Sequence, residues 1–179
     1  MTQLLFITGS TRRGSTNSAA LRTARELLGE EAAVVYEALG ELPAFNPDDD
    51  YEPLPPPVVS LRNAIAECDA VVFCTPEYAG TLPGSFKNLL DWTVGGSEIY
   101  GKPATWINVA GIGRGEGADA TLRIVLGYIG AAVLDSSGIR VPVSRDAVGP
   151  DGLISDEATR GQLADALATI LAEVPPVAP

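Results

Sequence analysis

The sequence has no histidine among its 179 residues. Histidine is the commonest general base in enzymes and the commonest metal ligand in proteins. Its absence excludes serine–histidine catalysis, cysteine–histidine catalysis and histidine–zinc chemistry. An enzyme built on this chain must therefore draw its chemistry from other groups.

Cysteine is scarce, and the two that occur, Cys68 and Cys74, lie six residues apart. This spacing matches no zinc motif, and their place beside an apolar run is typical of buried, reduced thiols in a cytosolic protein. No apolar run approaches the ~20 residues of a membrane span. The N-terminus also lacks a basic region followed by an apolar core. The sequence thus predicts a cytoplasmic protein.

Positive charge is in short supply. Twelve Lys and Arg against 23 Asp and Glu give a net charge of −11, which repels nucleic acids and anionic membranes. We expect neither as a partner, and any anionic ligand must be held by a local site. With 46% hydrophobic residues, the chain suffices for one well-buried domain, predicted to span residues 1–179.

Apolar runs alternate along the chain with segments of helical spacing. Strands are predicted at Leu4–Thr8, Ala33–Tyr36, Asp69–Thr75, Ala104–Val109 and within Val133–Val143, the last with an interruption near Gly138. Helices are predicted within residues 20–29, 58–65, 83–95, 122–130 and 155–171, followed by a tail at residues 174–179. Because the strands are apolar on both faces, they indicate a parallel sheet covered on both sides. The predicted fold is α/β: a flavodoxin-like, doubly wound sheet of five parallel strands in the order 2-1-3-4-5, with helices on both faces.

Three unusual loops follow the first, third and fourth strands, which are neighbours in this order. They should open at one edge of the sheet, where such folds bind ligands. The first, GSTRRGSTN, ends at a helix N-terminus, whose free N–H groups and dipole attract an anion. Ser10, Arg12, Ser15 and Asn17 add donors suited to one phosphate group. The alternative is a polar turn in which Ser15 or Asn17 caps the helix and both arginines, Arg13 in particular, are solvated.

The second loop, residues 76–84, offers a flat aromatic surface at Tyr78 and close backbone approach at Gly80. It could grip the edge of a planar ring. Glu77 is a candidate acid or base, although a solvated carboxylate is the commoner state for such a residue. We expect backbone contacts here rather than proton transfer.

The third loop, AGIGRGEG, spans residues 110–117. The stretch Gly113–Ala118, at its end, matches the dinucleotide pattern G-x-G-x-x-A, and Asp135 lies twenty residues beyond Gly115. One interpretation is a pyrophosphate site. Its place after the fourth strand, rather than the first, favours another, in which the glycines close over a bound ring.

Two of these motifs resemble a known family. GSTRRGSTN is similar to G-S-x-R-x-x-S-x-N, and PEYAGTLPGSFKNLLDW is similar to P-E-Y-N-x-x-x-P-G-x-L-K-N-x-x-D-W, of the NADPH-dependent FMN reductase family. The resemblance implies an FMN-dependent oxidoreductase. It would take hydride from NADPH or NADH and pass electrons to free flavin, a quinone, an azo compound or a metal oxyanion. It also implies a homodimer or homotetramer. A flavin-binding electron carrier without its own NAD(P)H activity is the alternative.

The resemblance assigns roles by position. The FMN phosphate and part of the ribityl chain would be held by Ser10, Arg12, Ser15, the Thr16 backbone and Asn17. The isoalloxazine would be lined by Pro76, Glu77, Tyr78, Ala79 and Gly80, and covered on its pyrimidine side by Gly111 to Gly113. Ala79 replaces the family's asparagine, so one side-chain contact is missing. Hydride transfer to flavin N5 needs no catalytic side chain, which agrees with the lack of histidine.

Two further segments complete the predictions. The helix around Lys87–Trp92 would pack on a partner subunit, or else only within the monomer. The long loop Leu42–Pro57 is expected to border the substrate site, with Phe45 or Tyr51 touching an aromatic acceptor. Its three aspartates, residues 48–50, are expected to be solvated rather than metal-binding.

Overall fold

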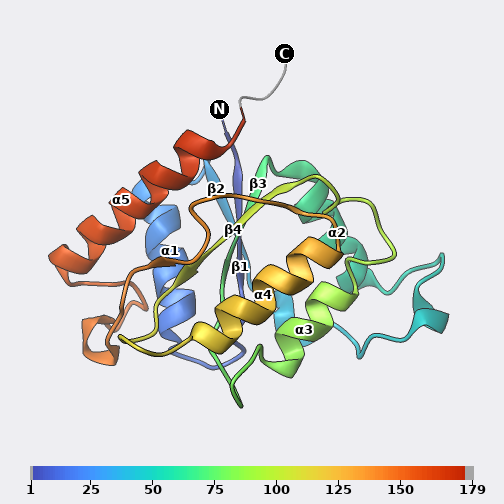
Figure 1. Cartoon of the computed structure of the whole chain (residues 1–179), viewed down its shortest axis with the longest axis horizontal. Helices are drawn as coiled ribbons and strands as arrows, with labels where there is room; N and C mark the ends of the chain where they lie inside the picture. Colours follow the sequence, from blue (N-terminus) through green and yellow to red (C-terminus); the bar gives the residue numbers. More distant parts are fainter. Residues whose placement is uncertain (1, 176–179) are drawn as a thin grey trace.

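A parallel sheet with helices on both faces organises residues 2–175, the part of the chain that the computed structural model describes (Figure 1). Its strands are β1 (Leu4–Thr8), β2 (Ala33–Tyr36), β3 (Ala70–Cys74), β4 (Pro103–Asn108), β5 (Ala132–Val133) and β6 (Ile139–Arg140). Its helices are α1 (Thr16–Leu28), α2 (Pro56–Glu67), α3 (Gly84–Asp91), α4 (Glu116–Tyr128) and α5 (Glu157–Glu173). The order β2-β1-β3-β4-β5 confirms the predicted topology. Most of the predicted tail, from residue 176 on, lies outside the described residues.

The two central strands explain why the sheet needs cover on both faces. Every residue of β1 and β3 is buried, and the strands pair in parallel with Leu4 opposite Ala70. Successive side chains point to opposite faces. Leu5 and Ile7 therefore pack against α2, α3 and α4, whereas Leu4 and Phe6 pack against α1 and α5. Figure 1 shows these two helical layers on either side of the strands.

The fifth strand is broken in two, as the sequence predicted near Gly138. Both pieces pair with β4: β5 beside Pro103 and Ala104, and β6 beside Ile107 and Asn108. Gly138 lies between the pieces with φ +84°, and a Cβ there would come within 3.2 Å of the Trp106 ring. The chain thus bends around an indole at this point, which only glycine permits without strain.

Both cysteines are free and buried, in agreement with the interpretation as reduced thiols. Burial raises the pKa of Cys68 to about 11 and also raises the pKa of Cys74. Both thiols are therefore protonated at neutral pH and poorly nucleophilic. Cys74 donates to Asn17 Oδ1 at 3.3 Å, which ties the end of β3 to the start of α1.

None of the helices within residues 2–175 is long and apolar enough to cross a membrane. The same residues contain no cluster of three or more acidic or thiol side chains able to hold a metal ion.

Candidate functional site

The first loop is a preformed cradle at the start of α1. Ser15 is the N-cap residue, and its hydroxyl accepts from Asn17 N at 3.2 Å. Gly14 takes the left-handed conformation at φ +64°. The Arg12 side chain folds back onto the loop, because its guanidinium donates to the Gly14 carbonyl at 2.9 Å. The backbone N–H of Arg12 donates to Ser10 Oγ at 3.3 Å. The capping role considered for Ser15 is thus confirmed.

The Ser15 cap leaves some backbone N–H groups at the start of α1 without an acceptor. An α-helix starts with four N–H groups that lack intrahelical partners. Ser15 accepts from Asn17, whereas no residue within 2–175 accepts from the N–H groups of Thr16 and Ser18. The Arg12 and Arg13 side chains are exposed beside them. The α1 N-terminus therefore keeps the unpaired amides and nearby positive charge that an anion requires.

The second loop forms a tight two-residue turn. Tyr78 N donates to the Thr81 carbonyl at 3.0 Å, and Thr81 N donates back to Tyr78 at 3.1 Å. Ala79 (φ +52°) and Gly80 (φ +76°) occupy the centre. Positive φ at both central residues defines a type I′ turn. Tyr78 is 53% exposed, so its ring is available at the surface.

Glu77, in the second loop, lies half-buried against the N-terminus of α4. Its Oε2 accepts from Gly117 N at 2.7 Å and from Ala118 N at 3.1 Å, in the first turn of α4. The interpretation of Glu77 as a solvated carboxylate is therefore wrong. The pyrophosphate interpretation of Gly113–Ala118 fails for the same reason, since the amides that a pyrophosphate would need are already occupied by a carboxylate.

The third loop is held from beneath by Asn108, at the end of β4. Asn108 Oδ1 accepts from Ala110 N at 2.9 Å, and Nδ2 donates to Asp119 Oδ2 at 2.7 Å. Asp119 also accepts from Trp106 Nε1 at 2.8 Å. Gly111 and Gly113 lie in the exposed part of the loop, on either side of Ile112, which is 96% exposed. The sequence reasoning missed Asn108 and Asp119, because polar residues at these positions form no recognisable motif.

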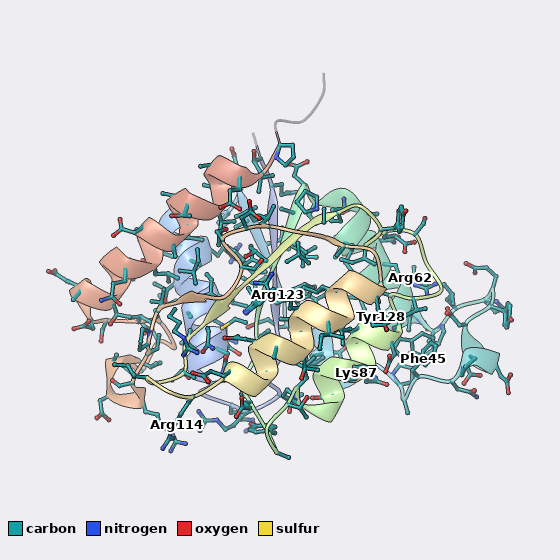
Figure 2. All side chains as sticks on the ribbon, in the orientation of Figure 1. Phe45, Arg62, Lys87, Arg114, Arg123 and Tyr128 are labelled. Carbon is teal, nitrogen blue, oxygen red and sulfur yellow. The ribbon has the colours of Figure 1, made fainter. Side chains whose placement is uncertain are left out.

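The long loop before α2 is fastened to α3. Asn88 accepts from Phe45 N at 2.7 Å, and Trp92 Nε1 donates to the Pro43 carbonyl at 2.8 Å. The Phe45 ring meets the Trp92 ring edge-on, with centroids 5.0 Å apart. Figure 2 shows Phe45 on this loop beside α3. The loop is thus a fixed strap, in which Phe45 packs inward while Tyr51 is 74% exposed.

Asp50 departs from the expectation of a solvated aspartate. Its carboxylate pairs with Arg62 at 2.7 Å, and both side chains are only 9% exposed. Arg62 also donates to the Trp92 carbonyl from Nε at 3.0 Å and from Nη2 at 2.8 Å. Asp48 and Asp49 are exposed, as predicted. The pair joins the strap, α2 and the end of α3.

The sequence and the fold are similar to those of known proteins. The family model described as NADPH-dependent FMN reductase matches residues 2–143. The chain belongs to this family. A relative in Pseudomonas aeruginosa, named NAD(P)H-dependent FMN reductase, is 32% identical over 162 residues, covering 88% of this chain and 87% of that protein. A Pseudomonas putida quinone reductase is 34% identical over 127 residues, covering 69% and 68% respectively.

Among solved structures, the flavoenzyme NAD(P)H:(acceptor) oxidoreductase FerB of Paracoccus denitrificans superposes with a TM-score of 0.79 at 26% identity, covering 97% of this chain and 99% of that one. Membership of the NADPH-dependent FMN reductase family confirms the flavodoxin-like fold and the predicted oxidoreductase activity. It also confirms FMN as cofactor and NAD(P)H as co-substrate.

The turn of the second loop departs from the family pattern at Ala79. Left-handed backbone costs an L-residue roughly 1–2 kcal/mol, and asparagine and glycine tolerate it better than alanine. We expect Ala79→Gly to raise the free energy of unfolding by about 1 kcal/mol, measured by urea denaturation. Ala164→Gly, at an exposed position inside α5, should lower it by about 1 kcal/mol. A loss of stability in both variants would contradict the strain assigned to Ala79.

Proposed function

We propose that this chain passes reducing equivalents from NAD(P)H, through FMN held at the edge formed by the three loops, to a small quinone-type acceptor. The observation that carries the placement of FMN is the α1 N-terminus. It combines unpaired backbone amides, the buried hydroxyls of Ser10 and Ser15 and the exposed guanidinium of Arg12. Among the helix N-termini that adjoin the loops, that of α1 keeps free amides beside the exposed Arg12 and Arg13, whereas the first amides of α4 are capped by Glu77.

The first loop offers hydrogen-bond donors that suit the phosphate end of FMN. A cavity of about 390 Å³ adjoins one side of this loop, where Ser10 and Arg12 line it together with Glu37 and Glu41, whereas Ser15 and Thr16 are not part of its lining. We assign the phosphate to Ser10, Arg12, Ser15 and the Thr16 backbone. Asn17 supports these residues and does not itself contact the phosphate in this assignment, because its side-chain amide donates to Ser15 Oγ and accepts from Cys74 Sγ.

The ring end of FMN fits the other two loops. Pro76 to Gly80 would line the isoalloxazine, and Gly111 to Gly113 would cover its pyrimidine side. The bound flavin supplies the hydride chemistry, which needs no proton-transferring side chain. The chain's part is to orient the ring and to present backbone N–H groups and the exposed Tyr78 beside it. Because the flavin supplies the chemistry and the chain only binds and orients it, the site needs no histidine.

The acceptor and the assembly are inferred from two further observations. Tyr78 and Ile112 are exposed at the loop edge, and flat aromatic acceptors such as quinones suit an open apolar surface. On α4, Ile124 (60% exposed) and Tyr128 (91% exposed) form an apolar strip beside Arg123. Figure 2 labels Arg123 and Tyr128 on this helix. We assign this strip to the homodimer or homotetramer contact. The buried free thiols suit a cytoplasmic setting.

The test is an anaerobic titration of the FMN-loaded protein with NADPH and, separately, NADH, followed by a quinone. Bleaching of the flavin absorbance by either nicotinamide and its return on adding the quinone are the expected results. A flavin that binds but is not bleached would replace the proposal by the electron carrier.

Arg12→Ala tests the placement of the phosphate. It should weaken FMN binding by roughly 10- to 100-fold, the worth of a charge-assisted hydrogen bond, and leave binding of riboflavin, which has no phosphate, unchanged. Arg25→Ala, an exposed arginine further along α1, is the control. Equal loss of both ligands in Arg12→Ala would overturn the assignment.

A further inference from the structure

Glu77 joins the two loops assigned to the flavin ring. We propose that it is a positioning residue: its carboxylate locks the second loop onto α4 and so fixes the width of the ring site before any flavin binds. This inference rests on the proposed function, because it takes the two loops as the walls of that site.

The contact between the second loop and α4 involves both backbone and side chains. Glu77 Oε2 takes the N–H groups of Gly117 and Ala118. Gly117 packs so closely on the Gly80 carbonyl that a Cβ would lie 2.1 Å from that oxygen. At the far side of the turn, Thr81 Oγ1 and Thr121 Oγ1 are 2.9 Å apart. The whole turn therefore rests on the first two helical turns of α4.

A carboxylate is well suited to this place, because α4 lacks a cap of its own. Its N-cap residue is Gly115, in left-handed conformation, with no side-chain cap. The Asp119 carboxylate, one turn further on, is occupied by Trp106 and Asn108. A negative charge at a helix N-terminus is stabilised both by the free N–H groups and by the helix dipole. Glu77 supplies that charge from a loop 40 residues earlier in the chain.

The arrangement ties the geometry of one loop to that of the other. Glu77 directly precedes the Tyr78–Thr81 turn, and residues 111–113 are joined to α4 by only Arg114, whose N–H donates to the Gly111 carbonyl at 3.1 Å, and the N-cap Gly115. Fixing the Glu77 side chain on α4 therefore sets the distance between the two walls. A site whose walls are held in place loses less conformational entropy when the ring enters, so its affinity is higher. Glu77 acts through the loops, and its carboxylate needs no contact with the flavin.

The experiment measures binding of FMN and of riboflavin to the apoprotein by isothermal titration calorimetry, for the wild type, Glu77→Ala and Glu77→Gln. A lost cap corresponds to roughly a tenfold effect. We expect Glu77→Ala to weaken both ligands by about tenfold, so that their affinity ratio stays the same, and Glu77→Gln, which keeps one acceptor oxygen, to recover part of the loss. Asp69→Ala is the matched control, since Asp69 also accepts a backbone N–H, that of Gln3, at 2.7 Å, but at the opposite edge of the sheet. It should leave both affinities unchanged.

Amide hydrogen exchange of the apoproteins supplies a second measurement. Glu77→Ala should speed exchange in the Tyr78–Thr81 turn as well as at Gly117 and Ala118. Faster exchange confined to α4, unchanged affinities in a folded variant, or loss of FMN binding without loss of riboflavin binding would each overturn the inference. Failure of the wild type to bind either flavin would instead overturn the proposed function. The exchange measurement would still test whether Glu77 holds the second loop on α4.

Discussion

Replacing Arg62 by alanine is expected to lower the free energy of unfolding by about 3–5 kcal/mol. Arg62 lies on α2, and its side chain is only 9% exposed. The variant would leave the Asp50 carboxylate without its partner at a site that water scarcely reaches. It would also free the Trp92 carbonyl at the end of α3. An unpaired buried charge is among the costliest defects a single substitution can create.

Urea denaturation followed by circular dichroism would measure this effect. Arg25→Ala is the matched control, because Arg25 pairs with Glu30 on the surface, with side chains 42% and 84% exposed. Exposed pairs contribute little, so its effect should stay below about 1 kcal/mol. Asp50→Asn, alone and with Arg62→Ala, completes a double-mutant cycle, and strong coupling is expected. Similar losses for Arg62→Ala and Arg25→Ala would contradict the structural role of the buried pair.

Gly117→Ala is expected to destabilise the protein by about 1–3 kcal/mol, the usual cost of overpacking, and to weaken flavin binding. The direction of the stability change is diagnostic, because replacing glycine by alanine in an unhindered helix raises the free energy of unfolding. At residue 117 the added Cβ would meet the Gly80 carbonyl oxygen at 2.1 Å, and a backbone atom cannot rotate away. The second loop would have to lift off α4, which separates the two walls assigned to the ring.

Gly161→Ala, an exposed glycine in α5, provides the control. A Cβ at Gly161 meets nothing within 4 Å, so this variant should gain up to about 1 kcal/mol and bind FMN as the wild type does. Thermal unfolding of the two apoproteins and calorimetric titration with FMN would distinguish them. A gain of stability in both variants would show that the second loop does not rest on α4.

The sequence predicted well those features that depend on neighbouring residues. The apolar runs of the sequence predicted β1 and β2 with the same bounds that the structure has. The helix expected from Pro83 begins one residue later, at Gly84, with Pro83 as its N-cap residue, and it ends at Asp91 rather than near Gly95. At its end, Thr93 N donates to the Leu90 carbonyl and Arg62 of α2 donates to the Trp92 carbonyl, a contact that cannot be read from the local pattern.

The candidate site shows the same limit. The donors of the first loop follow one another in the chain, so their cluster was visible in the sequence. Glu77 was misjudged because the amides it caps are 40 residues away, and the buried Asp50 was misjudged because two exposed aspartates precede it. A carboxylate looks alike in sequence whether it faces water or a helix N-terminus. Only the packing of loops against helices separates the two cases.

The two tryptophans of the chain stand beneath different parts of the site. Trp92 holds the strap through the Pro43 carbonyl, and Trp106 lies against α4, where its indole donates to Asp119 and the Arg123 guanidinium lies 5.0 Å from its ring. Each indole is therefore a built-in optical probe of one element. Exchanging either for phenylalanine would leave a single tryptophan, whose emission, excited at wavelengths that the five tyrosines do not absorb, reports on the strap or on α4 alone. The protein thus carries its own labels for following how these two parts respond when a flavin or an acceptor arrives.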